Sequence, residues 1–301
     1  MAVLGTALVL FANLLVGTWN LRWFPTGAAE PNPLMSAAEQ RQEETRNVVE
    51  TARVVREELR GQRPGEHVIL FFQELRDEAA CTNLLAHIGS TNQLRLACVS
   101  KFAVAKGSPV LQQDGIFTDL PILDAGWSRW RWPSGQKKGE KPIMPPRGYV
   151  FALLDGGADG VIACYGVHLK SNYAATADDE IAANRVKRER AVEQLVELTK
   201  KIKLADGRHV TRMVIAGDFN TDVFSSTYAG ERTIPLLTAA GYRNGLASAA
   251  PDQRGTYPRF GKHADETLDY IFHRGFLAQT ERWLSPANEV SDHRMLWLRL
   301  E

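Results

Sequence analysis

The chain has 301 residues, of which 44% are hydrophobic and 24% are charged, as is ordinary for a soluble globular protein. Its length suits one large domain, and we expect a single domain over residues 1–301. The formal net charge of +1 excludes a strong overall attraction to nucleic acid but allows a local basic patch. The three cysteines are far apart and form no C-x-x-C pair, which argues against a zinc site or a disulfide framework.

The N-terminal segment MAVLGTALVLFANLLVG is mostly apolar and has no Lys or Arg before Arg22. It resembles the core of an export signal, but it lacks a basic start and a good cleavage site. It is also too short, and too interrupted by polar residues and glycine, to predict a stable membrane span. We favour a core-facing strand near residues 8–19, and leave open whether the protein is cytoplasmic or exported.

Four segments have helical patterns. The first has Ser36 at its start and Glu39 three positions later, which predicts a capping box. The third is rich in charge, with Ile181, Val192, Leu195 and Leu198 expected on its buried face. The helices are predicted over residues 36–60, 77–88, 179–203 and 231–240.

Apolar runs rich in β-branched residues predict strands before, between and after these helices. They are expected over residues 14–19, 67–72, 94–102, 115–118, 149–154, 161–167, 212–216, 267–272 and 295–300. Because no helix separates the strands between residues 94 and 168, an α+β sandwich with outer helices is favoured over a Rossmann sheet. Residues 127–148 are predicted to form one long loop.

Several of the predicted strands end in residues that can bind a metal or move a proton. One such end is unremarkable, but five from distant parts of the chain predict strands that converge on one site. These ends are TWNLR (18–22), FQEL (72–75), VHLKS (167–171), GDFN (217–220), and the C-terminal pair LDYIF (268–272) with SDHRM (291–295).

This motif set, in this order, resembles the endonuclease/exonuclease/phosphatase family, and covers most of the chain from Trp19 to His293. The resemblance implies a four-layer α/β/β/α sandwich with its site at one edge of two packed sheets. It also implies hydrolysis of phosphoesters with Mg²⁺, or with Mn²⁺ or Ca²⁺ as alternatives. VHLKS resembles the histidine-bearing branches, which include pancreatic-type deoxyribonucleases, bacterial extracellular nucleases and sphingomyelinases.

The resemblance implies a role for each strand end. Glu74 and Asp292 would bind the metal, while Asn20 would orient its water or the phosphate. A carboxylate after an apolar strand is costly unless it is paired or bound to metal, which favours this role for Glu74 over that of a surface residue.

The remaining strand ends would carry the proton transfers. Asp269 would hold His293 in the tautomer that catalysis needs, and His168 would be the second imidazole at the phosphate. Asp218 and Asn220 are two positions apart, so they share one face of a strand and could hold the attacking water; read alone, GDFN would more often be a turn. Which histidine is the acid stays open.

The resemblance also implies residues that would contact the phosphate or support His168. Asp114 is the nearest match to an acidic partner for His168. Many family members carry a phosphate-binding Arg at the position of Asp119, and this chain departs from that pattern. Arg147 matches a phosphate-binding Arg of the family, and Arg22 is a second candidate.

The substrate class is indicated by residues 127–148, where tryptophans alternate with arginines and lysines follow. Interleaved aromatic and cationic residues suit base stacking and phosphate contact, although a hairpin with inward tryptophans fits the same pattern. We expect a monomeric nuclease that prefers DNA to RNA, with hydrolysis of a lipid or small phosphoester as the alternative and an inactive binding module last. The substrate-contact candidates in this stretch are Arg129, Trp130, Arg131, Lys137 and Lys138.

Overall fold

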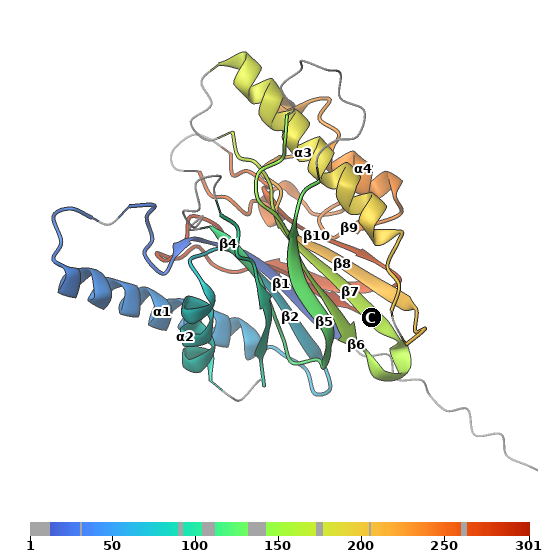
Figure 1. Cartoon of the computed structure of the whole chain (residues 1–301), viewed down its shortest axis with the longest axis horizontal. Helices are drawn as coiled ribbons and strands as arrows, with labels where there is room; N and C mark the ends of the chain where they lie inside the picture. Colours follow the sequence, from blue (N-terminus) through green and yellow to red (C-terminus); the bar gives the residue numbers. More distant parts are fainter. Residues whose placement is uncertain are drawn as a thin grey trace, which may run out of the picture.

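The computed structural model describes residues 13–30, 32–89, 93–103, 112–131, 143–172, 177–204, 206–259 and 264–301. Two six-stranded sheets pack against each other, and helices cover their outer faces (Figure 1). This is the expected α/β/β/α sandwich. Residues 1–12, on which most of the N-terminal interpretation depends, lie outside the described residues.

The first sheet has the strand order β11-β12-β1-β2-β4-β3. Its central pair, β1 and β2, runs parallel, whereas β12 and β4 lie antiparallel on either side of that pair. The strands are β1 (Leu14–Phe24), β2 (His67–Leu75), β3 (Arg95–Val99), β4 (Gln113–Thr118), β11 (Gln279–Leu284) and β12 (Leu296–Leu300).

The second sheet has the order β5-β6-β7-β8-β10-β9. Here β7 and β8 are the parallel pair, and the other pairings are antiparallel. The strands are β5 (Ile122–Arg129), β6 (Gly148–Asp155), β7 (Val161–His168), β8 (Val210–Asp218), β9 (Arg243–Asn244) and β10 (Asp269–Arg274).

Helices α1 (Ala37–Leu59) and α2 (Glu78–Ile88) lie on the outer face of the first sheet, and α3 (Asp178–Thr199) and α4 (Thr233–Ala239) on that of the second (Figure 1). Ser36 and Glu39 form the predicted capping box at the start of α1. One hydrophobic core fills the space between the sheets and extends under α3 and α4, while a second joins α1 and α2 to the first sheet. No helix among the described residues has the length and apolarity that crossing a membrane requires.

Several sequence expectations are wrong. The long loop begins later than predicted, because residues up to Arg129 form β5. The strand predicted over residues 94–102 is only β3, and β11 was missed because its charged, half-exposed sequence gives little apolar signal. Ile181 was expected to be buried but is 40% exposed, near the start of α3.

Candidate active site

The strand ends singled out in the sequence meet at one edge of the sandwich. Parallel neighbours finish at the same edge, so β7 and β8 place His168 opposite Asp218. Because β10 runs antiparallel to β8, Asp269 at its start also lies opposite Asp218. In the first sheet, β1 and β2 finish at this edge, with Asn20 beside Gln73.

Gly217 allows β8 to reach this point. Its φ of 142° is rarely open to other residues, and a Cβ placed there would lie 1.9 Å from the carbonyl oxygen of Val167. Immediately beyond it, Asp218 Oδ1 accepts the backbone N–H of Asn220 at 2.8 Å, and Asn220 Nδ2 donates to the carbonyl of Leu169 at 3.1 Å. GDFN is therefore both a turn and part of the polar cluster.

Asn20 joins the two sheets. Its Nδ2 donates to Asp218 Oδ2 at 2.9 Å and to Glu74 Oε1 at 3.3 Å. The other oxygen of Glu74 accepts the backbone N–H of Trp23 at 2.9 Å. The pairing of β2 shifts register between Phe72 and Leu75, an irregularity that re-aims Glu74 toward the cluster.

Backbone strain is concentrated at this edge. Among the described residues, the non-glycine residues with positive φ include Glu74 at 62°, Arg147 at 60° and Asn220 at 51°. Arg22 and Trp23, which follow Asn20, share this conformation. Each costs on the order of 1–2 kcal/mol, and such residues accumulate where function fixes a side chain's direction.

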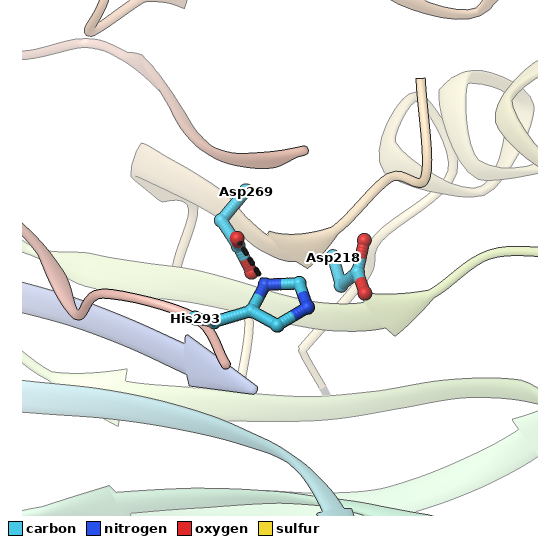
Figure 2. A group of neighbouring side chains, drawn as sticks. All are labelled: Asp218, Asp269 and His293. Atoms are coloured by element: carbon cyan, nitrogen blue, oxygen red, sulfur yellow. Dashed lines mark hydrogen bonds and ion pairs between the residues drawn. The ribbon is translucent and has the colours of Figure 1, made fainter. Parts of the chain in front are cut away.

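His293 comes from the segment before β12 and pairs with Asp269. Its Nδ1 lies 2.7 Å from Asp269 Oδ2, and Figure 2 shows the other ring nitrogen on the side of Asp218. Burial acts to lower the pKa of His293, but the charges of Asp269, Asp218 and Asp292 outweigh it and raise the pKa to about 10. This shift favours the charged form of His293, in which both ring nitrogens can donate.

His168 has the opposite character. Its Nε2 lies 3.6 Å from Asp218 Oδ2 and 3.8 Å from Glu74 Oε1. Burial lowers its pKa well below the usual value, and Arg147 and His293 add to the effect. Asp114, expected as its acidic partner, makes no hydrogen bond with it: both carboxylate oxygens of Asp114 and Nδ1 of His168 lack hydrogen bonds among the described residues.

The cluster fits a divalent cation. Burial raises the pKa of Asp218 to about 7, and the neighbouring charge of Asp269 adds to the effect. Burial likewise raises the pKa of Asp114 to about 7, although Arg147 opposes the change. Carboxylates this deeply buried and close together need positive charge, and oxygen donors suit Mg²⁺, Mn²⁺ or Ca²⁺. Asp218, Asp269 and His293 bring one donor atom each within 4.8 Å of one another, but Asp269 is already engaged by His293.

The remaining predicted site residues are either exposed or bonded to the backbone of the protein. Asp292 is exposed beside His293 and makes no hydrogen bond or ion pair with the described residues. Arg22, Arg129 and Arg131 are exposed. Arg147 donates to the carbonyls of His168 and Leu169 rather than to open space.

Trp130 does not have the expected exposure for base stacking. It is 5% exposed and packs on Tyr149, with ring centroids 5.2 Å apart, which matches the inward-facing alternative. Lys137 and Lys138 lie outside the described residues.

Sequence reasoning missed several supporting residues. Ser291 donates to the carbonyl of Asn20 at 2.6 Å and accepts the backbone N–H of His293 at 3.0 Å. Trp19 Nε1 donates to the His293 carbonyl at 2.9 Å. Both lie inside motifs quoted from the sequence, so proximity to the motif was their signal. The hydroxyl of Thr256 accepts the backbone N–H of Asp269, but Thr256 lies outside every quoted motif, so the sequence gave no signal for it.

The fold occurs in several solved structures. An endonuclease/exonuclease/phosphatase from Bacteroides vulgatus has 15% identity and a TM-score of 0.62, over 96% of this chain and 99% of that one. D. rerio TDP2 complexed with a single-strand DNA product has 15% identity and a TM-score of 0.58, over 96% and 99%.

A third structure is the inositol polyphosphate 5-phosphatase domain of SpSynaptojanin in complex with inositol (1,4)-bisphosphate and calcium. It has 14% identity and a TM-score of 0.55, over 96% of this chain and 83% of that one. At these identities the likeness shows the fold alone. No curated protein matches the chain.

A family model supplies the assignment that the fold alone does not. The model of the endonuclease/exonuclease/phosphatase family matches residues 17–293, which include every strand end of the cluster. The chain therefore belongs to the endonuclease/exonuclease/phosphatase family and is a metal-dependent phosphoester hydrolase.

Proposed function

We propose that the protein is a Mg²⁺-dependent nuclease that hydrolyses phosphodiesters of DNA. The observation that carries this proposal is the placement of two imidazoles, whose pKa values are shifted in opposite directions, beside one carboxylate. His168 lies 3.6 Å from Asp218, and the donor atoms of Asp218, Asp269 and His293 lie within 4.8 Å of one another. A diester needs one group to take a proton from water and another to supply one to the leaving alkoxide.

The pKa directions assign these two roles. Groups whose environments push their pKa values apart are suited to act as base and acid. His168, kept neutral by burial, would accept the proton of the attacking water. His293, kept charged by Asp269, would donate to the leaving oxygen.

The other residues would orient the reactants. Asp218 and Asn220 would hold the attacking water in line with the bond that breaks. Glu74, with Asn20 beside it, would hold the cation, and Asp292 would complete its surroundings from the rim. When bound, the cation supplies positive charge to the phosphate and the leaving oxygen.

DNA is the favoured substrate because Arg22, Arg129 and Arg131 are exposed and a structural neighbour was solved with a single-strand DNA product. Arg22, Arg129 and Arg131 would contact phosphates flanking the reacting one. Because Trp130 is buried, it would not stack on a base, and the exposed arginines would carry the contact with DNA in its place.

The test is a panel of substrates with Mg²⁺ or with EDTA. It would include plasmid, linear and single-stranded DNA, RNA, sphingomyelin, an inositol phosphate and bis(p-nitrophenyl) phosphate. DNA cleavage that EDTA abolishes is the expected result. Hydrolysis confined to the lipid or the inositol phosphate would replace the nuclease assignment, and DNA binding without any turnover would indicate an inactive module.

Variants link the activity to this site. His168→Ala and His293→Ala should each lower kcat by roughly 10²–10⁴-fold. His209→Ala is the control, because His209 is exposed and precedes β8 at the opposite end of that strand. Full activity in either site variant with an intact fold would contradict the proposal.

A further inference from the structure

The segment from His168 to Asn172 leaves β7 at the catalytic edge, and side chains from other parts of the chain bind it at every step. The carbonyl of His168 accepts Arg147 Nε at 3.1 Å. The carbonyl of Leu169 accepts Arg147 Nη2 at 2.9 Å and Asn220 Nδ2 at 3.1 Å. Four consecutive carbonyls, those of residues 168–171, are held in this way.

The last two carbonyls are bound from α3. Arg188 Nη1 donates to the carbonyl of Lys170 at 2.8 Å and to the side-chain oxygen of Asn172 at 3.1 Å. Asn184, one turn earlier on the helix, donates to the carbonyl of Ser171 at 3.2 Å. The carbonyls of a surface connection are ordinarily satisfied by water, whereas these four are bound by side chains from three other parts of the chain. Such anchoring fixes the position of the segment.

Arg188 is itself fixed by a buried ion pair. Its Nε and Nη2 donate to the two oxygens of Glu231 at 2.8 and 2.7 Å, and its side chain is 1% exposed. Thr233 donates to the same carboxylate at 2.6 Å. The forked contact uses two of the guanidinium nitrogens and leaves Nη1 directed at the segment.

Stability alone does not account for this pair. A buried ion pair is often no more stabilising than apolar side chains of similar volume, because both charges lose their hydration. What apolar side chains cannot supply is the charged donor that binds Lys170 and Asn172. The pair's distinctive contribution is therefore to the position of the segment that begins at His168.

We propose that Arg188 and Glu231 are positioning residues for phosphoester hydrolysis: through the carbonyl of Lys170 they hold the segment that carries His168 in its reactive place. The proposal rests on the proposed function of the same site. Neither residue touches the reacting atoms, so their effect should fall on turnover more than on substrate affinity.

The decisive variant replaces both partners, Arg188→Met with Glu231→Leu. It fills the space and removes both charges together, so Tm should be unchanged or raised. Turnover of bis(p-nitrophenyl) phosphate with Mg²⁺ should fall by about 10–100-fold in kcat, with less than about a threefold change in KM. Arg188→Lys, which keeps the charge but not the fork, should give an intermediate kcat.

Amide hydrogen exchange supplies a readout that does not depend on activity. The N–H of Leu169 donates to the carbonyl of Asp218 at 2.8 Å, so loosening of the segment should accelerate its exchange. The matched control is Arg232→Met, which removes an ion pair with Glu189 between α3 and the segment before α4. Among the described residues, the side chain of Arg232 makes hydrogen bonds and ion pairs with Glu189 and Glu193 and none with residues 168–172. It should leave both kcat and exchange at Leu169 unchanged.

Each outcome decides the proposal. Wild-type kcat in a stable double variant would show that the pair only packs, and a lower kcat without faster exchange at Leu169 would place its effect elsewhere; both overturn the proposal. If the double variant does not fold, Arg188→Lys is judged by the same two measurements. If the wild-type protein hydrolyses no phosphoester, the proposed function fails, while exchange still decides whether the pair holds the segment.

Discussion

Asp269 and His293 form a buried pair in which the carboxylate oxygen lies 2.7 Å from Nδ1 of the imidazole. Since a carboxylate can only accept, Nδ1 carries the proton, and Nε2 is left to face the substrate. Asp269→Asn removes the charge that raises the pKa of His293, so the charged form that would donate to the leaving oxygen is less favoured. We expect kcat to fall by roughly 10²–10⁴-fold at saturating Mg²⁺, measured with bis(p-nitrophenyl) phosphate.

A second carboxylate–histidine pair supplies the control for this variant. Asp119 Oδ2 lies 3.1 Å from Nδ1 of His67, at the end of β2 remote from the cluster. Asp119→Asn should therefore leave kcat unchanged. If the two substitutions had equal effects, the pairing of Asp269 with His293 would have no special role.

Glu74→Gln keeps the shape of the side chain but removes one negative charge from the proposed metal site. We expect the Mg²⁺ concentration that gives half-maximal activity to rise by at least about tenfold, because Mg²⁺ binds carboxylates far better than amides. The measurement is a Mg²⁺ titration of activity. Glu78→Gln is the control, since Glu78 pairs with Lys101 at the exposed start of α2. An unchanged half-saturation in Glu74→Gln would remove Glu74 from the metal site.

Gly217→Ala tests the close approach of β7 and β8. The added Cβ would meet the carbonyl oxygen of Val167 at 1.9 Å, so the strands must separate. We expect the free energy of unfolding to fall by at least about 2 kcal/mol in urea titrations. Gly207→Ala separates clash from backbone strain, because Gly207 also has positive φ but no atom within 4 Å of where an added Cβ would lie. Equal losses in the two variants would show that contact with Val167 is unimportant.

The sequence predicted the polar cluster better than it predicted the strands around it. Apolar runs locate buried strands, and polar residues at their ends indicate a shared edge. The pairing of β7 with β8 places His168 opposite Asp218, and the sequence alone does not predict this pairing. β5 and β11 are edge strands with solvated faces, so their apolar signal is weak.

Two side chains show the limits of motif reasoning about the site. Trp130 fitted a pattern typical of base stacking. It instead follows β5 directly and packs in the core against Tyr149. Asp114 lies near the cluster, where burial raises its pKa and the charges of Asp218 and Glu74 add to the effect, but it makes no hydrogen bond with His168. Whether two polar side chains form a hydrogen bond depends on differences of less than about one ångström in their separation. The types and order of the residues do not specify such differences.

His273 should make the protein sensitive to mild acid. It is 1% exposed in β10, and burial lowers its pKa to about 4, while Gln279 opposes the change and Arg243 adds to it. In the unfolded chain His273 therefore takes up a proton near pH 6.5, whereas in the folded protein it takes one up only near pH 4. The stability that a neutral His273 allows is complete above about pH 6.5 and is lost as pH falls toward 4.

The check is the free energy of unfolding between pH 4 and 7. In His273→Gln, a neutral side chain of similar polarity, the loss over this range should be smaller by on the order of 2–3 kcal/mol. His87→Gln is the control, because His87 is only half-buried at the end of α2. The same acid sensitivity in His273→Gln and wild type would exclude His273 as its source.

The left-handed backbone at Glu74, Arg147 and Asn220 has a consequence for engineering this enzyme. Glycine would adopt these conformations without strain, so a search for heat-tolerant variants by thermal challenge alone would favour glycine there. Each such gain would delete a carboxylate, guanidinium or amide from the catalytic edge. A stabilisation campaign should therefore hold these three positions constant and look for improvement in the helical layers.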